Sequence, residues 1–86
     1  MTTRFTYQHL VELVGGDDEL ITRLVEVGEI EQRDDGVAVV DLDRVLTTRT
    51  LVRELEVDWP GVEVILRLLT ELAEARRRIA ELEARR

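Results

Sequence analysis

Residues 7–28 have the sequence YQHLVELVGGDDELITRLVEVG, in which two apolar runs at helical spacing lie on either side of a glycine pair. Thr6 is placed to cap a first helix, which the glycine pair would end. Asp17 or Asp18 can cap a second helix, and Gly28 can close it. Two short helices joined by a glycine-containing turn predict a helix-turn-helix.

The next segment, IEQRDDGVAVV over residues 30–40, changes from helical to strand character. β-branched residues lie on both sides of Asp34-Asp35-Gly36, and Asp-Gly between two such runs is a strong hairpin signal. This pattern predicts a small two-stranded wing. It would depend on the helices for its stability, because an isolated hairpin is marginal in water.

The remaining sequence predicts two further helices. Asp41 can cap a third helix that extends to Leu55, and Asp58 can cap a last helix in which Pro60 falls in the tolerated first turn. Apolar residues on the last helix recur in steps of three and four, which is typical of a coiled-coil seam. The seam residues are Ile65, Leu68, Leu72, Ala75, Ile79 and Leu82.

The last helix is long for so small a protein. A helix of about 27 residues extends roughly 40 Å, so its end should project from the body and pair with a second copy. The alternative is a solvated tail, because ARRRIAELEARR at the C-terminus is mostly charged. We expect one structural domain with two parts: a winged helix-turn-helix and third helix over residues 1–57, and the dimerising coiled-coil helix over residues 58–86.

Composition narrows the function. The chain has 86 residues, no Cys and a formal net charge of −7, so disulfides, thiolate metal sites and Cys nucleophiles are excluded. No apolar run approaches the roughly 20 residues of a membrane span, and no signal-peptide pattern is present. We therefore expect a cytoplasmic protein without a membrane partner, a metal or a cofactor. Residues 1–40 hold three Arg against nine acids, a net of −6, which favours a basic protein partner over nucleic acid.

The predicted order of elements resembles the MerR-like winged helix-turn-helix proteins, which are mainly α-helical with a small β-hairpin wing and a long C-terminal coiled-coil helix. Two stretches narrow the resemblance. RELEVDWPG over residues 53–61, followed by VEVILRLL, is similar to the CbpM-type chaperone modulators, and VDWPG is its most specific part. ELITRLVEVGEIEQR over residues 19–33 resembles the second helix and wing of the same family.

This resemblance implies a function without catalysis. Members of that family bind the J-domain of a DnaJ-like, CbpA-type co-chaperone and restrain its action on Hsp70 and, in the type member, on DNA. The Hsp70-binding surface of a J-domain is a basic helix, which an acidic protein can compete for by charge complementarity. We therefore predict that the J-domain contacts an acidic set, with the third or the last helix as alternatives. The acidic set consists of Asp17, Asp18, Glu19, Glu26 and Glu29.

The main alternative is a MerR-like DNA-binding transcriptional regulator. Such a protein needs cations on its second helix and wing to contact phosphates and bases. The second helix offers Arg23 alone, and the wing offers Arg33 beside two aspartates, so the sequence disfavours direct DNA binding. The basic run Arg76–Arg78 is more typical of the solvated face of a coiled coil.

An enzyme is also disfavoured. His9 is the single histidine, and a lone histidine near a helix start is more typical of a surface or partly packed position. The paired aspartates are explained by a helix cap and a turn, and neither EF-hand spacing nor a phosphate-binding glycine loop is present. Trp59 should pack the start of the last helix onto the core, with partner contact as the alternative reading.

Overall fold

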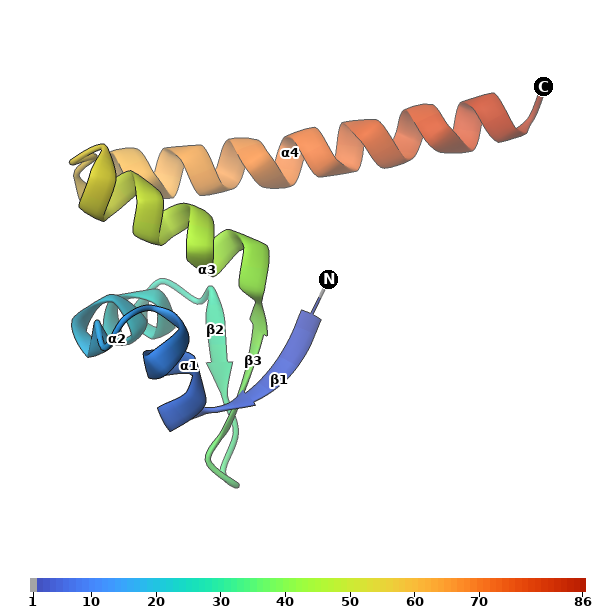
Figure 1. The fold of residues 1–86 in the computed structure, drawn as a ribbon. Helices are drawn as coiled ribbons and strands as arrows, with labels where there is room; N and C mark the ends of the chain where they lie inside the picture. Colours follow the sequence, from blue (N-terminus) through green and yellow to red (C-terminus); the bar gives the residue numbers. More distant parts are fainter. Residues whose placement is uncertain (1) are drawn as a thin grey trace.

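The computed structural model describes residues 2–86 and confirms a mainly helical chain with a small sheet and a long C-terminal helix (Figure 1). The helix-turn-helix, the wing, the third helix and the last helix follow in the predicted order. In chain order the elements are β1 (Thr2–Thr6), α1 (Tyr7–Leu13), α2 (Asp18–Glu26), β2 (Ile30–Gln32), β3 (Val37–Asp41), α3 (Leu42–Arg49), the π-helical turn η1 (Thr50–Glu54) and α4 (Trp59–Ala84).

Each α-helix begins where the sequence places a cap. The capping oxygen accepts a hydrogen bond from a backbone N–H three residues further on, which satisfies a donor that the first turn leaves free. At the other end of α2, Gly28 adopts φ 83° and the N–H of Glu29 donates to the carbonyl of Leu24 at 2.9 Å. This Schellman closure turns the chain towards the sheet. The four caps are Thr6, Asp17, Asp41 and Asp58.

The sheet has three strands, so the prediction of a two-stranded wing was incomplete. The hairpin of β2 and β3 forms as expected, with Ile30 opposite Val40. β1 adds to the other edge of β3 in antiparallel register, from Thr2 opposite Asp41 to Thr6 opposite Val37, giving the order β1-β3-β2. The extra strand satisfies backbone groups that the edge of β3 would otherwise expose.

The third helix does not continue as an α-helix to Leu55, which corrects the prediction. It ends at Arg49 and widens into η1, where the N–H of Leu55 donates to the carbonyl of Thr50 five residues back at 3.1 Å. Glu56 then adopts φ 54°, which reverses the chain before α4. A π-helical turn changes the direction of the side chains that follow it, and such turns are frequent at functional sites.

The core lies between the helix-turn-helix and the sheet, and α3 closes it. α4 joins this body through Val62 and Leu66, which are its buried side chains. From residue 71 onwards every side chain of α4 is exposed, and Figure 1 shows the helix extending beyond the body. No helix within residues 2–86 has the length and apolarity needed to cross a bilayer. The core residues are Leu10, Val14, Leu20, Ile21, Leu24, Ile30, Ala38, Val40 and Val45.

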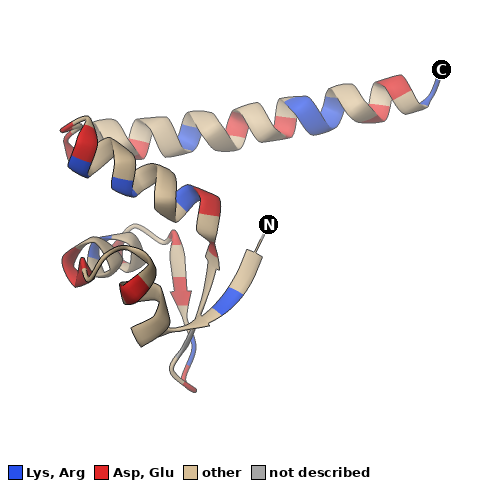
Figure 2. Cartoon of the chain, in the orientation of Figure 1, with Lys and Arg blue, Asp and Glu red and all other residues tan. Residues whose placement is uncertain are grey.

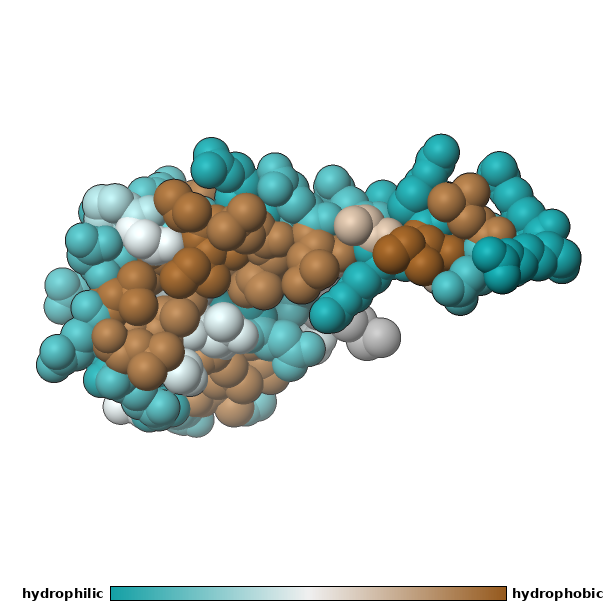
Figure 3. Space-filling view, turned by 90° about the horizontal axis from the view of Figure 1, so that it is seen from above, coloured by the Kyte–Doolittle hydropathy of each residue, from teal (hydrophilic) through white to brown (hydrophobic). Residues whose placement is uncertain are grey.

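Of the six predicted seam residues, Ile65 is half-buried where α4 packs on the body, and the other five are exposed. Leu68 and Leu72 are 53% and 45% exposed, and Ile79 and Leu82 are 54% and 50% exposed. Figure 3 shows an apolar band along the helix near the body and a second apolar group near its far end. The single chain therefore leaves the whole distal seam uncovered.

One arginine connects the parts of the molecule. The guanidinium of Arg44, in α3, binds both carboxylate oxygens of Glu29 at 2.8 and 2.7 Å. It also donates to the carbonyl of Leu66 at 3.0 Å and to the hydroxyl of Thr70 at 2.9 Å, both on α4. The hydrogen bonds to Glu29 raise the pKa of Arg44 above its ordinary value. We call these four residues the Arg44 network.

Arg44→Met should lower the free energy of unfolding by about 1–3 kcal/mol, because it leaves the Glu29 carboxylate partly buried without its cation. Urea denaturation followed by circular dichroism measures the change. Arg4→Met is the control: the ion pair between Arg4 and Asp35, at 3.7 Å, is exposed, so its loss should change stability little. Equal effects of the two substitutions would contradict a structural role for the Arg44 network.

Candidate functional site

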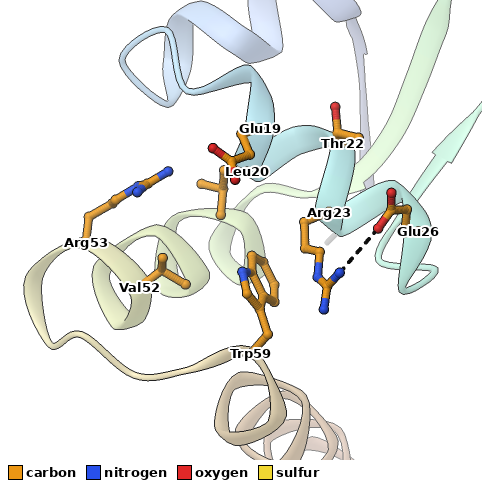
Figure 4. Close-up of a pocket in the computed structure, with 8 residues that line it drawn as sticks. All are labelled: Glu19, Leu20, Thr22, Arg23, Glu26, Val52, Arg53 and Trp59. Carbon is orange, nitrogen blue, oxygen red and sulfur yellow. Dashed lines mark ion pairs between the residues drawn. The ribbon is translucent and has the colours of Figure 1, made fainter.

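A groove of about 410 Å³ lies between α2, η1 and the start of α4. Figure 4 shows that its side chains come from segments well separated in the sequence, with Trp59 lying between Val52 on one side and Arg23 on the other. A groove with an aromatic floor and charged walls is a common form of protein-binding site. We call it the α2–α4 groove, and it is lined by Glu19, Leu20, Thr22, Arg23, Glu26, Val52, Arg53 and Trp59.

The VDWPG segment builds the floor of this groove. Asp58 caps α4 by accepting from the N–H of Gly61 at 3.0 Å, and Pro60 occupies the first turn. A Cβ added at Gly61 would lie 2.9 Å from Cγ1 of Val57, so the close approach of chain and helix requires glycine there. The cap and the tight turn together fix Trp59 as the first residue of α4.

Trp59 has two contacts that matter for the site. Its half-buried side chain packs against the core, as the sequence analysis expects, and its ring also lines the groove. Cζ of Arg23 lies 5.4 Å from the centroid of this ring. Nη1 of Arg23 is also 3.5 Å from a carboxylate oxygen of Glu26 (Figure 4). An aromatic face and a carboxylate thus hold a cation between them.

A second ion pair fixes the other end of the groove. Asp17 caps α2 by accepting from the N–H of Leu20 at 3.1 Å, and its second carboxylate oxygen accepts from Nε of Arg53 at 2.5 Å. The hydrogen bond from Arg53 is the main reason that the pKa of Asp17 lies below its ordinary value of 3.8. This contact ties η1 to the start of α2.

The structure divides the predicted acidic set. Asp18, Glu19 and Glu26 are exposed on α2, and the last two line the groove. Asp17 and Glu29 are held in ion pairs with arginines of η1 and α3, and their side chains are only 17% and 21% exposed. Glu29 contributes to a different hollow, of about 260 Å³, beside α4. Three of the five acids are therefore exposed on the α2 surface, and Glu26 among them is paired with the exposed Arg23.

Local sequence patterns do not identify the arginines and the valine of the groove. Arg23 stands out in the sequence only as the lone cation of its helix, whereas Val52 and Arg53 reach the groove through the π-helical turn. Trp59, as the single tryptophan beside the family-like segment, was the one available signal. Its partners depend on tertiary contacts that no local pattern encodes.

Cations on the elements that would face DNA are already paired. On the wing, Nε of Arg33 lies 3.5 Å from a carboxylate oxygen of Glu31, and Arg4 of β1 lies 3.7 Å from Asp35. On α2, Arg23 is paired with Glu26. Figure 2 shows acidic residues around α2 and η1 and a cluster of basic residues far along α4. Phosphates approaching α2 would therefore meet carboxylates.

His9, weighed in the sequence as a candidate catalytic group, lies at the surface of α1. Its ring meets the ring of Phe5 edge to face, with centroids 5.5 Å apart. Its backbone N–H donates to the hydroxyl of Thr6 in the helix cap. The contacts described for His9 are structural.

Asp17→Asn should retain most of the helix cap but lose the charge on Asp17, whereas Asp17→Ala should lose both and cost about 1 kcal/mol or more. Because folding lowers the pKa of Asp17 from 3.8, its ionisation stabilises the protein above that pH, and this contribution disappears as the pH falls through the lowered pKa. The stability difference between the native chain and Asp17→Asn should therefore be constant above about pH 5 and shrink below pH 4. Urea denaturation between pH 3 and 7 tests this, and a pH-independent difference would contradict it.

Residues 5–84 match the family described as MerR HTH family regulatory protein. No curated protein and no solved structure matches the chain.

Proposed function

This chain belongs to the MerR helix-turn-helix family of regulatory proteins, and from that premise we propose that it is a non-enzymatic regulator that binds the J-domain of a DnaJ-like, CbpA-type co-chaperone. By occupying that domain in the cytoplasm it restrains the action of the co-chaperone on Hsp70 and on DNA. The observation that carries the proposal is the acidic face of α2, with exposed Asp18, Glu19 and Glu26, in the place where a DNA-binding protein needs cations.

The position of the α2–α4 groove supports a protein partner. The VDWPG segment, which carries the resemblance to the CbpM-type modulators, is also the segment that places Trp59 beside the acids of α2. A tryptophan bordered by charged side chains is a frequent anchor at protein interfaces. The most specific motif and the most acidic helix therefore meet at one surface, which suits the basic helix of a J-domain.

The proposed regulator also forms a homodimer through α4. Beyond residue 70 the helix has no buried side chain, and an isolated helix of about 14 residues is marginal in water. Four exposed large apolar residues recur along this seam at coiled-coil spacing, so a second copy would bury them and hold the helix in place. These residues are Leu68, Leu72, Ile79 and Leu82.

DNA binding is the second candidate function, and the match to a helix-turn-helix family of regulators favours it. The charge of α2 opposes it, because function depends on the surface that a fold presents rather than on the fold alone. Each titration of the chain with the J-domain should therefore be accompanied by a titration with duplex DNA, which tests this second function.

Titration of the J-domain into the full chain by calorimetry should show binding of about micromolar strength or better that weakens as salt rises, since the attraction is electrostatic. Glu19→Lys and Glu26→Lys should each weaken binding several-fold, mainly by slowing association. Glu12→Lys on α1 and Asp34→Lys on the wing make the same charge change elsewhere and serve as controls. Lack of J-domain binding together with tight binding to a DNA duplex would replace the proposal with the transcriptional regulator.

Leu72→Asp should convert the dimer to a monomer, because it buries a charge in the seam, and the helical circular dichroism signal should fall as the distal part of α4 frays. Sedimentation equilibrium measures the association. Arg77→Ala changes the net charge by the same amount on the face of the helix opposite the seam, so it should leave the dimer intact. A native chain that sediments as a monomer at high concentration would contradict the dimer.

A further inference from the structure

Two arginines line the α2–α4 groove, and Arg23 is held less firmly than Arg53. Both side chains are about half exposed, at 47% and 50%. The closest carboxylate oxygen to Arg23, on Glu26, lies 3.5 Å away, whereas Arg53 donates a hydrogen bond to Asp17 at 2.5 Å. An exposed pair between residues three apart on a helix adds little stability, so Arg23 can leave at low cost.

What Arg23 occupies is a site suited to any cation. The face of the Trp59 ring attracts positive charge, and the Glu26 carboxylate completes the other side. Both groups line the α2–α4 groove, Glu26 from α2 and Trp59 from the start of α4, so a side chain that enters the groove from another molecule can reach them (Figure 4). We call the pair Trp59 and Glu26 the cation seat.

The surroundings of the seat fit a helix that is both basic and apolar. Val52 and Trp59 are half-buried in the groove, and Leu55 at the end of η1 is 63% exposed. Acids also lie on the elements that form the groove: Glu19 lines it, and further exposed acids lie on α2 and around the end of η1. An amphipathic helix docks in such a groove through apolar side chains while its cations meet the rim. These acids are Asp18, Glu19, Glu54 and Glu56.

We propose that the α2–α4 groove receives the basic amphipathic helix of a partner protein, and that a Lys or Arg of that helix displaces Arg23 from the cation seat. The identity of the partner as a J-domain rests on the proposed function. In the free chain Arg23 acts as an internal competitor that occupies the seat. When one cation replaces another, Glu26 keeps an ion pair and Trp59 keeps a cation on its ring. The cation seat should therefore bind a cationic helix more tightly than a neutral one.

This mechanism predicts effects of opposite sign within one helical turn. Arg23→Ala should tighten binding of a basic helix about two- to fivefold, because no internal cation must leave, and Glu26→Gln should weaken it by a similar factor. Arg33→Ala removes the same charge at the wing and is the matched control for long-range electrostatics. Its effect on affinity should be smaller and should vanish at high salt, where the Arg23→Ala effect persists.

Two probes are titrated into the full chain: the J-domain, and a synthetic Leu/Lys amphipathic peptide without aromatic residues, with its Leu/Glu counterpart as a negative control. Trp59 is the only tryptophan of the chain, so its fluorescence reports on the seat directly during the peptide titration. The expected result is a fluorescence change with the Leu/Lys peptide and tighter binding of both probes to Arg23→Ala. Neither Arg23 nor Glu26 is buried, so both variants should fold.

The outcomes separate this inference from the proposed function. If the J-domain binds in a salt-sensitive way and Arg23→Ala and Glu26→Gln leave its affinity unchanged, the cation seat is contradicted and the proposed modulator function is supported. Failure of the J-domain to bind, with Leu/Lys peptide binding that tightens in Arg23→Ala, overturns the partner and leaves the seat standing. Binding of neither probe overturns both, and an Arg23→Ala effect no larger than that of Arg33→Ala also overturns the seat.

Discussion

The contact between Arg44 and Glu29 is the constraint on which the arrangement of this molecule depends. Both side chains are only 21% exposed, so their charges have lost much of their water and must satisfy each other. The same guanidinium reaches the Leu66 carbonyl and the Thr70 hydroxyl, so a single charged group connects the end of α2, the start of α3 and the middle of α4. α4 itself buries only Val62 and Leu66. Its direction therefore depends on this polar contact as well as on apolar packing.

The groove is a consequence of the same arrangement. Trp59 begins α4, so the angle at which that helix leaves the body decides how far the indole lies from α2. The cap at Asp58 and the close approach at Gly61 fix the start of the helix locally, while the Arg44 network fixes its course two turns later. Between them they leave Trp59 half-buried: its ring packs against the core and is still accessible to a cation. A residue in that position can serve stability and recognition together, which is why the structural and the functional readings of Trp59 do not compete.

Local chemistry was predictable and long-range pairing was not. Caps at Thr6, Asp17, Asp41 and Asp58 act on residues three positions away, and the Asp-Gly hairpin acts over a similar span, so the sequence alone located them. β1 is short and mostly exposed, and it becomes a strand only because the distant β3 offers an edge. The division of the acidic set depends on partners further along the chain: Asp17 meets Arg53, and Glu29 meets Arg44. The number and position of charges in the sequence identify the acids, but they do not show which of them form ion pairs within the folded chain.

Because the exposed distal half of α4 extends beyond the body, a small rotation of the helix at the body displaces its far end by a larger distance. Residue 84 lies about 27 Å beyond the contact at Leu66 along the helix axis, so a rotation of about 10° at that contact moves the tip by about 5 Å. Small adjustments in the packing of the body are therefore amplified into large displacements at the far end. In a pair of chains joined along this helix, the separation and the relative orientation of the two grooves would depend on the rigidity of the contacts that hold α4 to the body. If each chain of such a pair holds a partner molecule, the distance between the two partners depends on α4 rather than on either binding surface.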